Sequence, residues 1–195
     1  MYLLRASPCF TSNNLVLYDN ALRDSLSLLT NADLSGSSWD QASLPVWTGE
    51  LGVHSAALLA PSAFLASAVG TATLVSQILP SRFSSTPDLM VPLALSIWEA
   101  LVGPGAVPPT NSSSQRAWDT LCCTAAADVL LTNHTDLVSQ ARLKAVRTKG
   151  ADNWLHALPL ANIGLKLDDM SLEAVVALRL GAPAMFEHTC CKELW

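Results

Sequence analysis

Apolar residues recur at intervals of three and four positions along much of this chain, which is the period of an amphipathic helix. In the first such segment, residues 13–29, the recurring side chains are Leu15, Tyr18, Leu22, Leu26 and Leu29. This spacing lines them up on one helical face, and Asp19 and Arg23 can pair on another. The pattern therefore predicts a helix over 13–29 with one buried side.

The segment 51–79 differs because it contains no Asp, Glu, Lys or Arg. Pro61 and Gly70 interrupt it, so we expect them to divide it into two helices that form a buried hairpin. The segment is long enough to span a bilayer, but no strong basic cluster or aromatic belt flanks it. We therefore expect no membrane association, and we retain association through 51–79 as the weaker alternative.

Start and stop signals predict the later helices. The segment 103–110, G-P-G-A-V-P-P-T, follows one predicted helix and has the composition of a linker. A helix that begins near Thr135 or Asp136 should end around Gly150, and one that follows Asp168 should end at Gly181.

Alternation of apolar and polar residues is confined to 163–167, which is too short to build a sheet. The sequence therefore predicts an all-α fold, an irregular helical bundle of about seven to nine helices in two sub-bundles. We divide the chain into a helical region at 1–102, a Pro/Gly/Ser linker at 103–114 and a second helical region at 115–195.

Residues 44–68, L-P-V-W-T-G-E-L-G-V-H-S-A-A-L-L-A-P-S-A-F-L-A-S-A, place a loop with Gly49 and Gly52 before a run of small residues. Glycine adopts backbone angles that other residues resist. The segment resembles the one that follows the catalytic palm in the reverse transcriptases of non-LTR retrotransposons. There a Gly-Gly-Leu-Gly turn precedes an Ala/Ser-rich helix, and Glu50 stands here in place of the second glycine.

Further blocks resemble the same open reading frames and occur in the same order. They are M-Y-L-L-R-A-S-P-C at 1–9, Q-I-L-P-S-R-F at 77–83, Q-R-A-W-D at 115–119, W-L-H-A-L-P at 154–159, G-L-K-L-D-D at 164–169, V-A-L-R-L-G-A-P at 176–183 and H-T-C at 188–190. The resemblance implies that 1–102 is a thumb-like helical region and that 115–195 is a truncated connection region. In this family such elements help hold primer and template and join the polymerase to later domains.

The catalytic motif of such a polymerase is missing from this sequence. In the family, an aromatic-x-Asp-Asp hairpin of the palm holds the divalent metal ions. The only Asp pair here, Asp168 and Asp169, follows Leu165, Lys166 and Leu167, so a lysine stands where the family has its aromatic residue. An apolar helical pattern follows the pair, which favours a helix-capping role. We therefore predict no enzymatic activity, no catalytic residue, no cofactor and no metal site.

The chain carries 11 Lys and Arg against 16 Asp and Glu, a formal net charge of −5. Nonspecific nucleic-acid binding draws its free energy mainly from cations that neutralise phosphates, so this balance argues against nucleic-acid binding. The densest basic stretch, A-R-L-K-A-V-R-T-K-G, supplies the candidate nucleic-acid contacts Arg142, Lys144, Arg147 and Lys149. The competing interpretation is a solvated helix face whose cations complement the helix C-terminus.

Charged residues make up 14% of the chain, well below the roughly 25% of soluble domains, so we expect exposed apolar patches that bind protein partners or a second copy. Cys122 and Cys123 lie in an apolar helical pattern and are expected to be buried. His188, Cys190 and Cys191 offer too few ligands for structural zinc. The N-terminus lacks the continuous apolar core of a signal peptide, so we expect an intracellular protein, cytoplasmic or nuclear, that is not secreted.

Three functional hypotheses follow. The first is a non-catalytic fragment of a retrotransposon-encoded reverse-transcriptase-like protein without independent activity. The second is a helical protein–protein interaction module that docks through apolar patches onto a partner or onto itself. The third is a protein that associates with membranes through 51–79.

Overall fold

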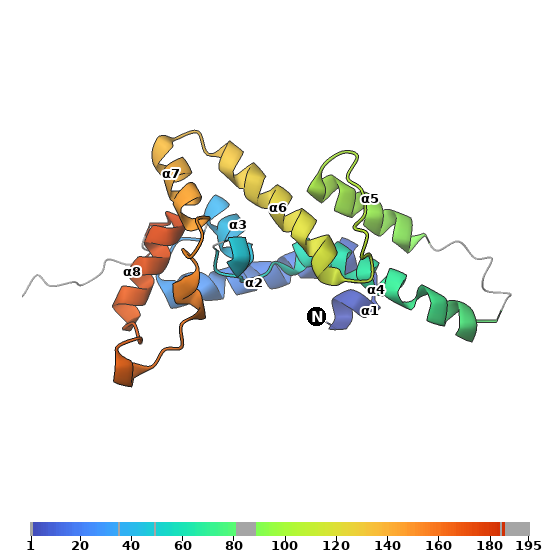
Figure 1. Cartoon of the computed structure of the whole chain (residues 1–195), viewed down its shortest axis with the longest axis horizontal. Coiled ribbons are helices and arrows are strands. Elements are labelled where there is room, and N and C mark those ends of the chain that lie inside the picture. The colour runs from blue at the N-terminus through green and yellow to red at the C-terminus, as the bar shows by residue number, and fades with distance from the viewer. Residues whose placement is uncertain (1, 35, 49, 81–88, 184, 186–195) are drawn as a thin grey trace, which may run out of the picture. The chain divides into compact units, whose positions relative to one another are not determined.

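The computed structural model describes residues 2–34, 36–48, 50–80, 89–183 and 185, and it is all-α (Figure 1). The α-helices of this part of the chain are α1 (Tyr2–Ala6), α2 (Asn13–Thr30), α3 (Ser37–Ser43), α4 (Ala56–Ile78), α5 (Met90–Val102), α6 (Gln115–Asn133), α7 (Leu137–Val146) and α8 (Asp169–Leu180). The short 3₁₀ helices are η1 (Cys9–Thr11), η2 (Val46–Thr48), η4 (Asn153–His156) and η5 (Ala161–Ile163). No β-strand occurs among the described residues, so the predicted fold class and the predicted range of helix number are confirmed.

The chain forms two compact units, each built from two separate segments. Unit 1 comprises Met1–Asp19 and His54–Asp128, and unit 2 comprises Asn20–Val53 and Val129–Trp195. The boundaries fall within α2 and α6, so each of these helices contributes residues to both units. The sequence division placed the boundary at 103–114, a segment that lies inside unit 1. The Pro, Gly and Ser content of 103–114 identifies a loop, whereas the two units are defined by packing between segments that are distant in the sequence.

Helix α4 is central to unit 1, where it contacts α1, α5 and η1. Ala63, which is fully buried, packs beside Leu4 of α1. Two residues further along, Leu65 packs in a cluster with Trp98 of α5 and Trp118 of α6. The two indole rings meet edge to face, with centroids 4.8 Å apart and planes at 83°, which is a favoured arrangement for aromatic pairs. Small residues on α4 thus let neighbouring helices come close enough to bury these rings.

The N-terminus of α4 is capped by a side chain from another helix, Asp19 of α2. Asp19 Oδ1 accepts a hydrogen bond from the Ala56 N–H at 2.7 Å, and Oδ2 accepts from the Ala57 N–H at 3.1 Å. Oδ2 also accepts from the Ser55 hydroxyl at 2.6 Å, and Ser55 Oγ accepts from the Leu58 N–H. The first N–H groups of a helix have no partner within it, and a carboxylate also opposes the positive end of the helix dipole. Asp19, which is 6% exposed, therefore satisfies and fixes the start of α4.

Helix α4 is uninterrupted, so the expectation that Pro61 and Gly70 divide this segment is wrong. Pro61 stands in the second turn and is buried in the core, and its missing N–H removes a single helical hydrogen bond. Gly70 costs only about 1 kcal/mol in a helix interior, which is less than ending the helix there would cost. The expectation of a buried hairpin is also wrong for the end of the segment, because residues 69–80 are all exposed.

The core of unit 2 joins α8 to the region around α3. Its buried residues are Ala32, Leu34, Ala42, Val176, Leu180 and Ala182. Asp168 caps α8 by accepting a hydrogen bond from the Ser171 N–H at 2.8 Å, and Gly181 ends it in the left-handed conformation with φ of 61°. The predicted capping role of Asp168 and the predicted stop at Gly181 are confirmed. Helix α3 was not predicted, because its first turn, at Ser37 and Ser38, has the composition of a loop.

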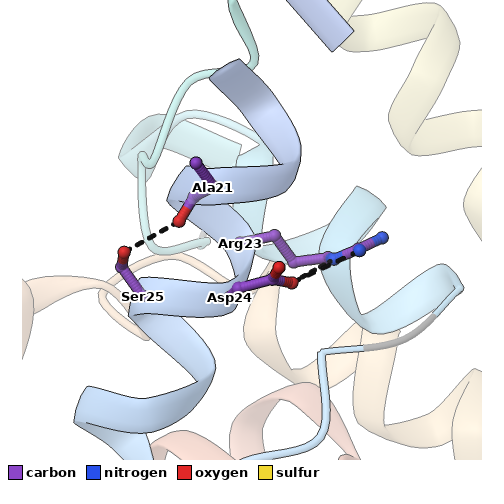
Figure 2. Close-up of polar contacts among 4 residues, drawn as sticks. All are labelled: Ala21, Arg23, Asp24 and Ser25. Carbon is purple, nitrogen blue, oxygen red and sulfur yellow. Dashed lines mark hydrogen bonds and ion pairs between the residues drawn. The ribbon is translucent and has the colours of Figure 1, made fainter. Parts of the chain in front are cut away.

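The part of α2 that belongs to unit 2 carries local polar contacts on its surface (Figure 2). Arg23 Nε and Nη2 each lie 3.3 Å from Asp24 Oδ1, and the Ser25 hydroxyl donates to the Ala21 carbonyl at 2.8 Å. The expected partner of Arg23, Asp19, is engaged instead in the α4 cap. The Arg23–Asp24 pair is exposed, so it contributes little to stability.

Replacing Asp19 with alanine should destabilise the protein by about 2 kcal/mol, because three donors lose their acceptor at once. Asp19→Asn should lose less, since its amide oxygen still accepts. Urea unfolding followed by circular dichroism measures both changes. Asp24→Ala, a control on the same helix, should change the free energy of unfolding by no more than about 0.5 kcal/mol. Equal losses for Asp19→Ala and Asp24→Ala would contradict the role of the cap.

Candidate functional site

A closed loop in unit 2 directs one acidic side chain into the interior. The Gly52 N–H donates to the Leu44 carbonyl at 2.9 Å, which closes the loop. Gly52 has φ of 73°, and a Cβ at this position would lie 2.8 Å from Val46 Cγ2, so glycine is required there. The predicted conformational need for Gly52 is confirmed, whereas Gly49 lies outside the described residues. Two residues before Gly52, Glu50 is buried with only 1% of its surface exposed.

Glu50 takes part in a polar cluster that joins its loop to α3, α7 and α8. Gln41 Nε2 of α3 lies 2.9 Å from one Glu50 carboxyl oxygen and 3.1 Å from the other, and it also donates to the Arg179 carbonyl at 3.1 Å. Arg142 Nη1 of α7 donates to Gln41 Oε1 at 2.6 Å and to the same carbonyl of α8. The Gln41 amide therefore links the buried carboxyl to the guanidinium. We call Gln41, Glu50, Arg142 and Arg179 the Glu50 cluster.

Burial determines the protonation state of the Glu50 carboxyl. Removal from water raises the pKa of Glu50 from 4.5 to about 7, although the hydrogen bond from Gln41 and the positive charges of Arg179, Arg142 and Arg147 act in the opposite direction. The carboxyl therefore titrates near neutral pH. Only 1% of the surface of Glu50 is exposed, so its carboxyl is not accessible to a substrate. Its role in the structure is to connect elements inside unit 2.

The candidate nucleic-acid contacts do not share one open face. Arg142 is turned into the Glu50 cluster, where its guanidinium lies so close to Gly181 that a Cβ there would be 2.6 Å from Nε. Lys144, Arg147 and Lys149 are exposed. Nucleic-acid contact through these three residues stays a prediction.

The connecting role of Glu50, Gln41 and Arg179 was not predicted from the sequence. A usable signal was present for one of them, because Glu50 is the only acidic residue between Asp40 and Asp88. A single carboxylate in a long uncharged stretch indicates a buried and partnered group. Gln41 and Arg179 carry no comparable signal, since they meet Glu50 only through the fold.

The two cysteines of α6 are buried, as predicted. Ser62 of α4, which is fully buried, places its Oγ 3.8 Å from Cys122 Sγ. Burial raises the pKa of Cys122 to about 11 and that of Cys123 to about 12. Because the thiolate is the reactive form, both thiols are inert near neutral pH.

Metal-binding side chains do not gather in the part of the chain that the structure describes, where no group of three His, Cys, Asp or Glu residues could hold an ion. His188, Cys190 and Cys191 lie outside the described residues. Unit 1 also has an open cavity of about 600 Å³, lined by leucines of α1, α2 and α4 together with Ser7, Ser12, Asn14 and His54. Its volume is that of a small-molecule site, but its lining does not select a ligand class.

An exposed apolar surface covers the outer parts of α4 and α5. The two helices pack together through Leu65 and Ala66 against Ala94 and Trp98. Beyond this contact lies what we call the hairpin surface, formed by Val69, Leu74, Val75, Ile78, Leu79, Leu89, Met90 and Leu93, with exposures from 37% to 70%. Figure 1 shows this part of α4, in green, running away from α1. Among the described helices, α4 is the only one long and apolar enough to cross a membrane, and 39% of its most apolar window is buried.

A comparison of the chain with known protein families, with curated proteins and with solved structures gives no match. The resemblance to reverse transcriptases of non-LTR retrotransposons, based on blocks such as 44–68 and 176–183, therefore stays a prediction.

The Glu50 cluster predicts a pH dependence of stability. Between about pH 4.5 and pH 7 the unfolded chain has lost the Glu50 proton while the folded chain retains it, so the folded state weakens as pH rises. The loss should reach about 3 kcal/mol above pH 7 and be absent below pH 4.5. Glu50→Gln, which keeps an acceptor for Gln41, should remove this slope and stabilise the protein at neutral pH.

Urea unfolding at about pH 4.5 and about pH 8 measures this effect as the difference between the wild type and Glu50→Gln. Asp24→Asn, which changes an exposed carboxylate of the same unit, should keep the wild-type slope. A Glu50→Gln protein with an unchanged slope would show that Glu50 ionises as freely in the folded chain as in the unfolded one.

Proposed function

We propose that this protein is a helical interaction module that acts by docking through the hairpin surface rather than by catalysis. The observation that supports this most is the exposure of eight large apolar side chains on adjoining parts of α4 and α5. Folded proteins bury most of their large apolar side chains, and a group of exposed ones on two neighbouring helices is typical of an interaction site. The low charge content of the chain, 14%, agrees with a surface meant to be covered.

The polar groups of the interior support the same proposal. The Glu50 carboxyl is enclosed, and the thiols of Cys122 and Cys123 are held neutral. Groups in these states do not offer a substrate a reactive atom. The function of the chain is then expected at its surface and not in its interior.

The resemblance to reverse transcriptases suggests an origin for such a module. We therefore propose a non-catalytic, retrotransposon-derived fragment as the source of the exposed helices. The purified chain should then incorporate no nucleotide on a primed RNA template, and incorporation would refute this origin.

The interaction proposal predicts that the hairpin surface binds an apolar phase in solution. The wild-type chain should be retained on a phenyl matrix, and Leu74→Ser with Ile78→Ser should reduce retention strongly, because each replacement removes an exposed aliphatic side chain. Both side chains are exposed, so the variant should unfold within about 0.5 kcal/mol of the wild type.

The matched control is Leu28→Ser with Leu29→Ser, which removes from α2 two leucines that are at least as exposed as Leu74 and Ile78 taken together. It should keep most of the retention. If both double variants lose retention equally, or if the wild type is a strict monomer by light scattering and passes through the matrix, the hairpin surface is not an interaction site.

A further inference from the structure

The hairpin surface carries no formal charge. No Asp, Glu, Lys or Arg occurs in 51–79, and the only charged residue of α5 is Glu99, which lies three residues from the helix end and accepts a hydrogen bond from the Gly105 N–H at 3.0 Å. Protein interfaces normally combine an apolar centre with a polar rim whose charges select the partner. A lipid bilayer requires no such rim. The absence of charge over this length therefore favours lipid over a protein partner.

Hydroxyl groups on the same helices already have acceptors within their own helix. The Thr71 hydroxyl donates to the Ser67 carbonyl at 2.8 Å, and the Ser76 hydroxyl donates to the Thr73 carbonyl at 2.7 Å. On α5 the Ser96 hydroxyl donates to the Leu93 carbonyl at 2.8 Å. An unsatisfied polar group costs several kcal/mol in hydrocarbon, whereas a hydroxyl bonded to its own helix avoids much of that cost. These side chains do not oppose transfer of the surface into lipid.

The exposed half of α4 has two sides. Leu74, Val75, Ile78 and Leu79 follow the spacing of one helical face, and Gly70, Thr73, Ser76 and Gln77 occupy the opposite one. An apolar helical side of this kind can enter the boundary between lipid headgroups and acyl chains, where interfacial helices bury their apolar side by about 5–10 Å.

A complete crossing by α4 conflicts with its packing. Leu59, Ala63 and Leu65 are buried in the core of unit 1, so only 69–78 and the residues just beyond are available. At 1.5 Å per residue this segment is about 15 Å long, roughly half of the bilayer hydrocarbon. The free half of α4 fits one leaflet.

We propose that the partner of the hairpin surface is the interface of an electrically neutral lipid bilayer, in which the apolar sides of α4 and α5 insert while unit 1 stays folded. This inference rests on the proposed function and names its partner. The net charge of −5 acts against anionic lipid and also against close approach of a second copy, but it has no such effect at a zwitterionic surface.

The test is flotation of the full chain with phosphatidylcholine vesicles. The wild type should float with the vesicles, and Leu74→Ser with Ile78→Ser should lower the fraction bound by roughly tenfold or more, since it removes aliphatic area that the bilayer buries. Leu28→Ser with Leu29→Ser should bind as the wild type does. Added phosphatidylserine should not improve binding, and added salt should not weaken it, because no cation of the surface takes part.

A second measurement does not depend on loss of binding. Leu74→Trp should show tryptophan quenching by brominated phosphatidylcholine beyond that of the wild type, and Leu28→Trp should show no such increase. Circular dichroism of each variant confirms that it is folded.

The outcomes separate the two proposals. A wild-type chain that stays in the aqueous fraction, yet is retained on the phenyl matrix or self-associates through Leu74 and Ile78, overturns the bilayer inference and leaves the interaction module with a second copy as its partner. A chain that does neither overturns both. Binding that increases with phosphatidylserine content overturns the neutral-bilayer inference.

Discussion

Unit 1 depends on one carboxylate. Asp19 reaches from α2 to the first turn of α4, where it accepts three hydrogen bonds and is almost completely buried. This contact joins the start of α4 to α2. Helix α4 in turn contacts α1 and α5, and the aromatic core of Trp98 and Trp118 packs beside it. With its N-terminus satisfied and its first half packed, α4 continues past Gly70, and among the described residues its apolar side chains there are exposed. The cap and the packing at the start of α4 thus hold the helix in place, while the apolar side chains at its other end stay exposed.

Unit 2 uses a buried acid in a different way. Glu50 accepts hydrogen bonds from the Gln41 amide, and burial favours its neutral form. A buried carboxyl of this kind makes the folded state sensitive to pH without giving it access to a substrate. In both units a buried carboxyl therefore connects helical elements: Asp19 joins α2 to α4, and Glu50 joins its loop to α3. The hairpin surface is apolar, and it is the basis of the proposed interaction role.

Local signals in the sequence predicted the elements that local forces decide. Gly103 and Gly181 end helices, and Asp136 and Asp168 begin them, because caps act within one turn. The failures occurred where tertiary contacts decide the outcome. Pro61 is tolerated since the core surrounds its turn, and Arg142 was expected at the surface because nothing near it in sequence reveals Gln41 as its partner. The hairpin surface was foreseen only as a general shortage of charge, because the extent to which α5 and α6 cover α4 is a property of the fold.

The central claim is that α4 is a single helix, anchored by Asp19 at one end and covered by lipid at the other. Hydrogen exchange along α4, with and without phosphatidylcholine vesicles, tests it most directly. Amides of 56–66 should be protected in both conditions, and those of 70–78 should gain protection only when vesicles are present. Exchange at 70–78 that is unchanged by vesicles, or already as slow as at 56–66 in the free chain, would contradict the account.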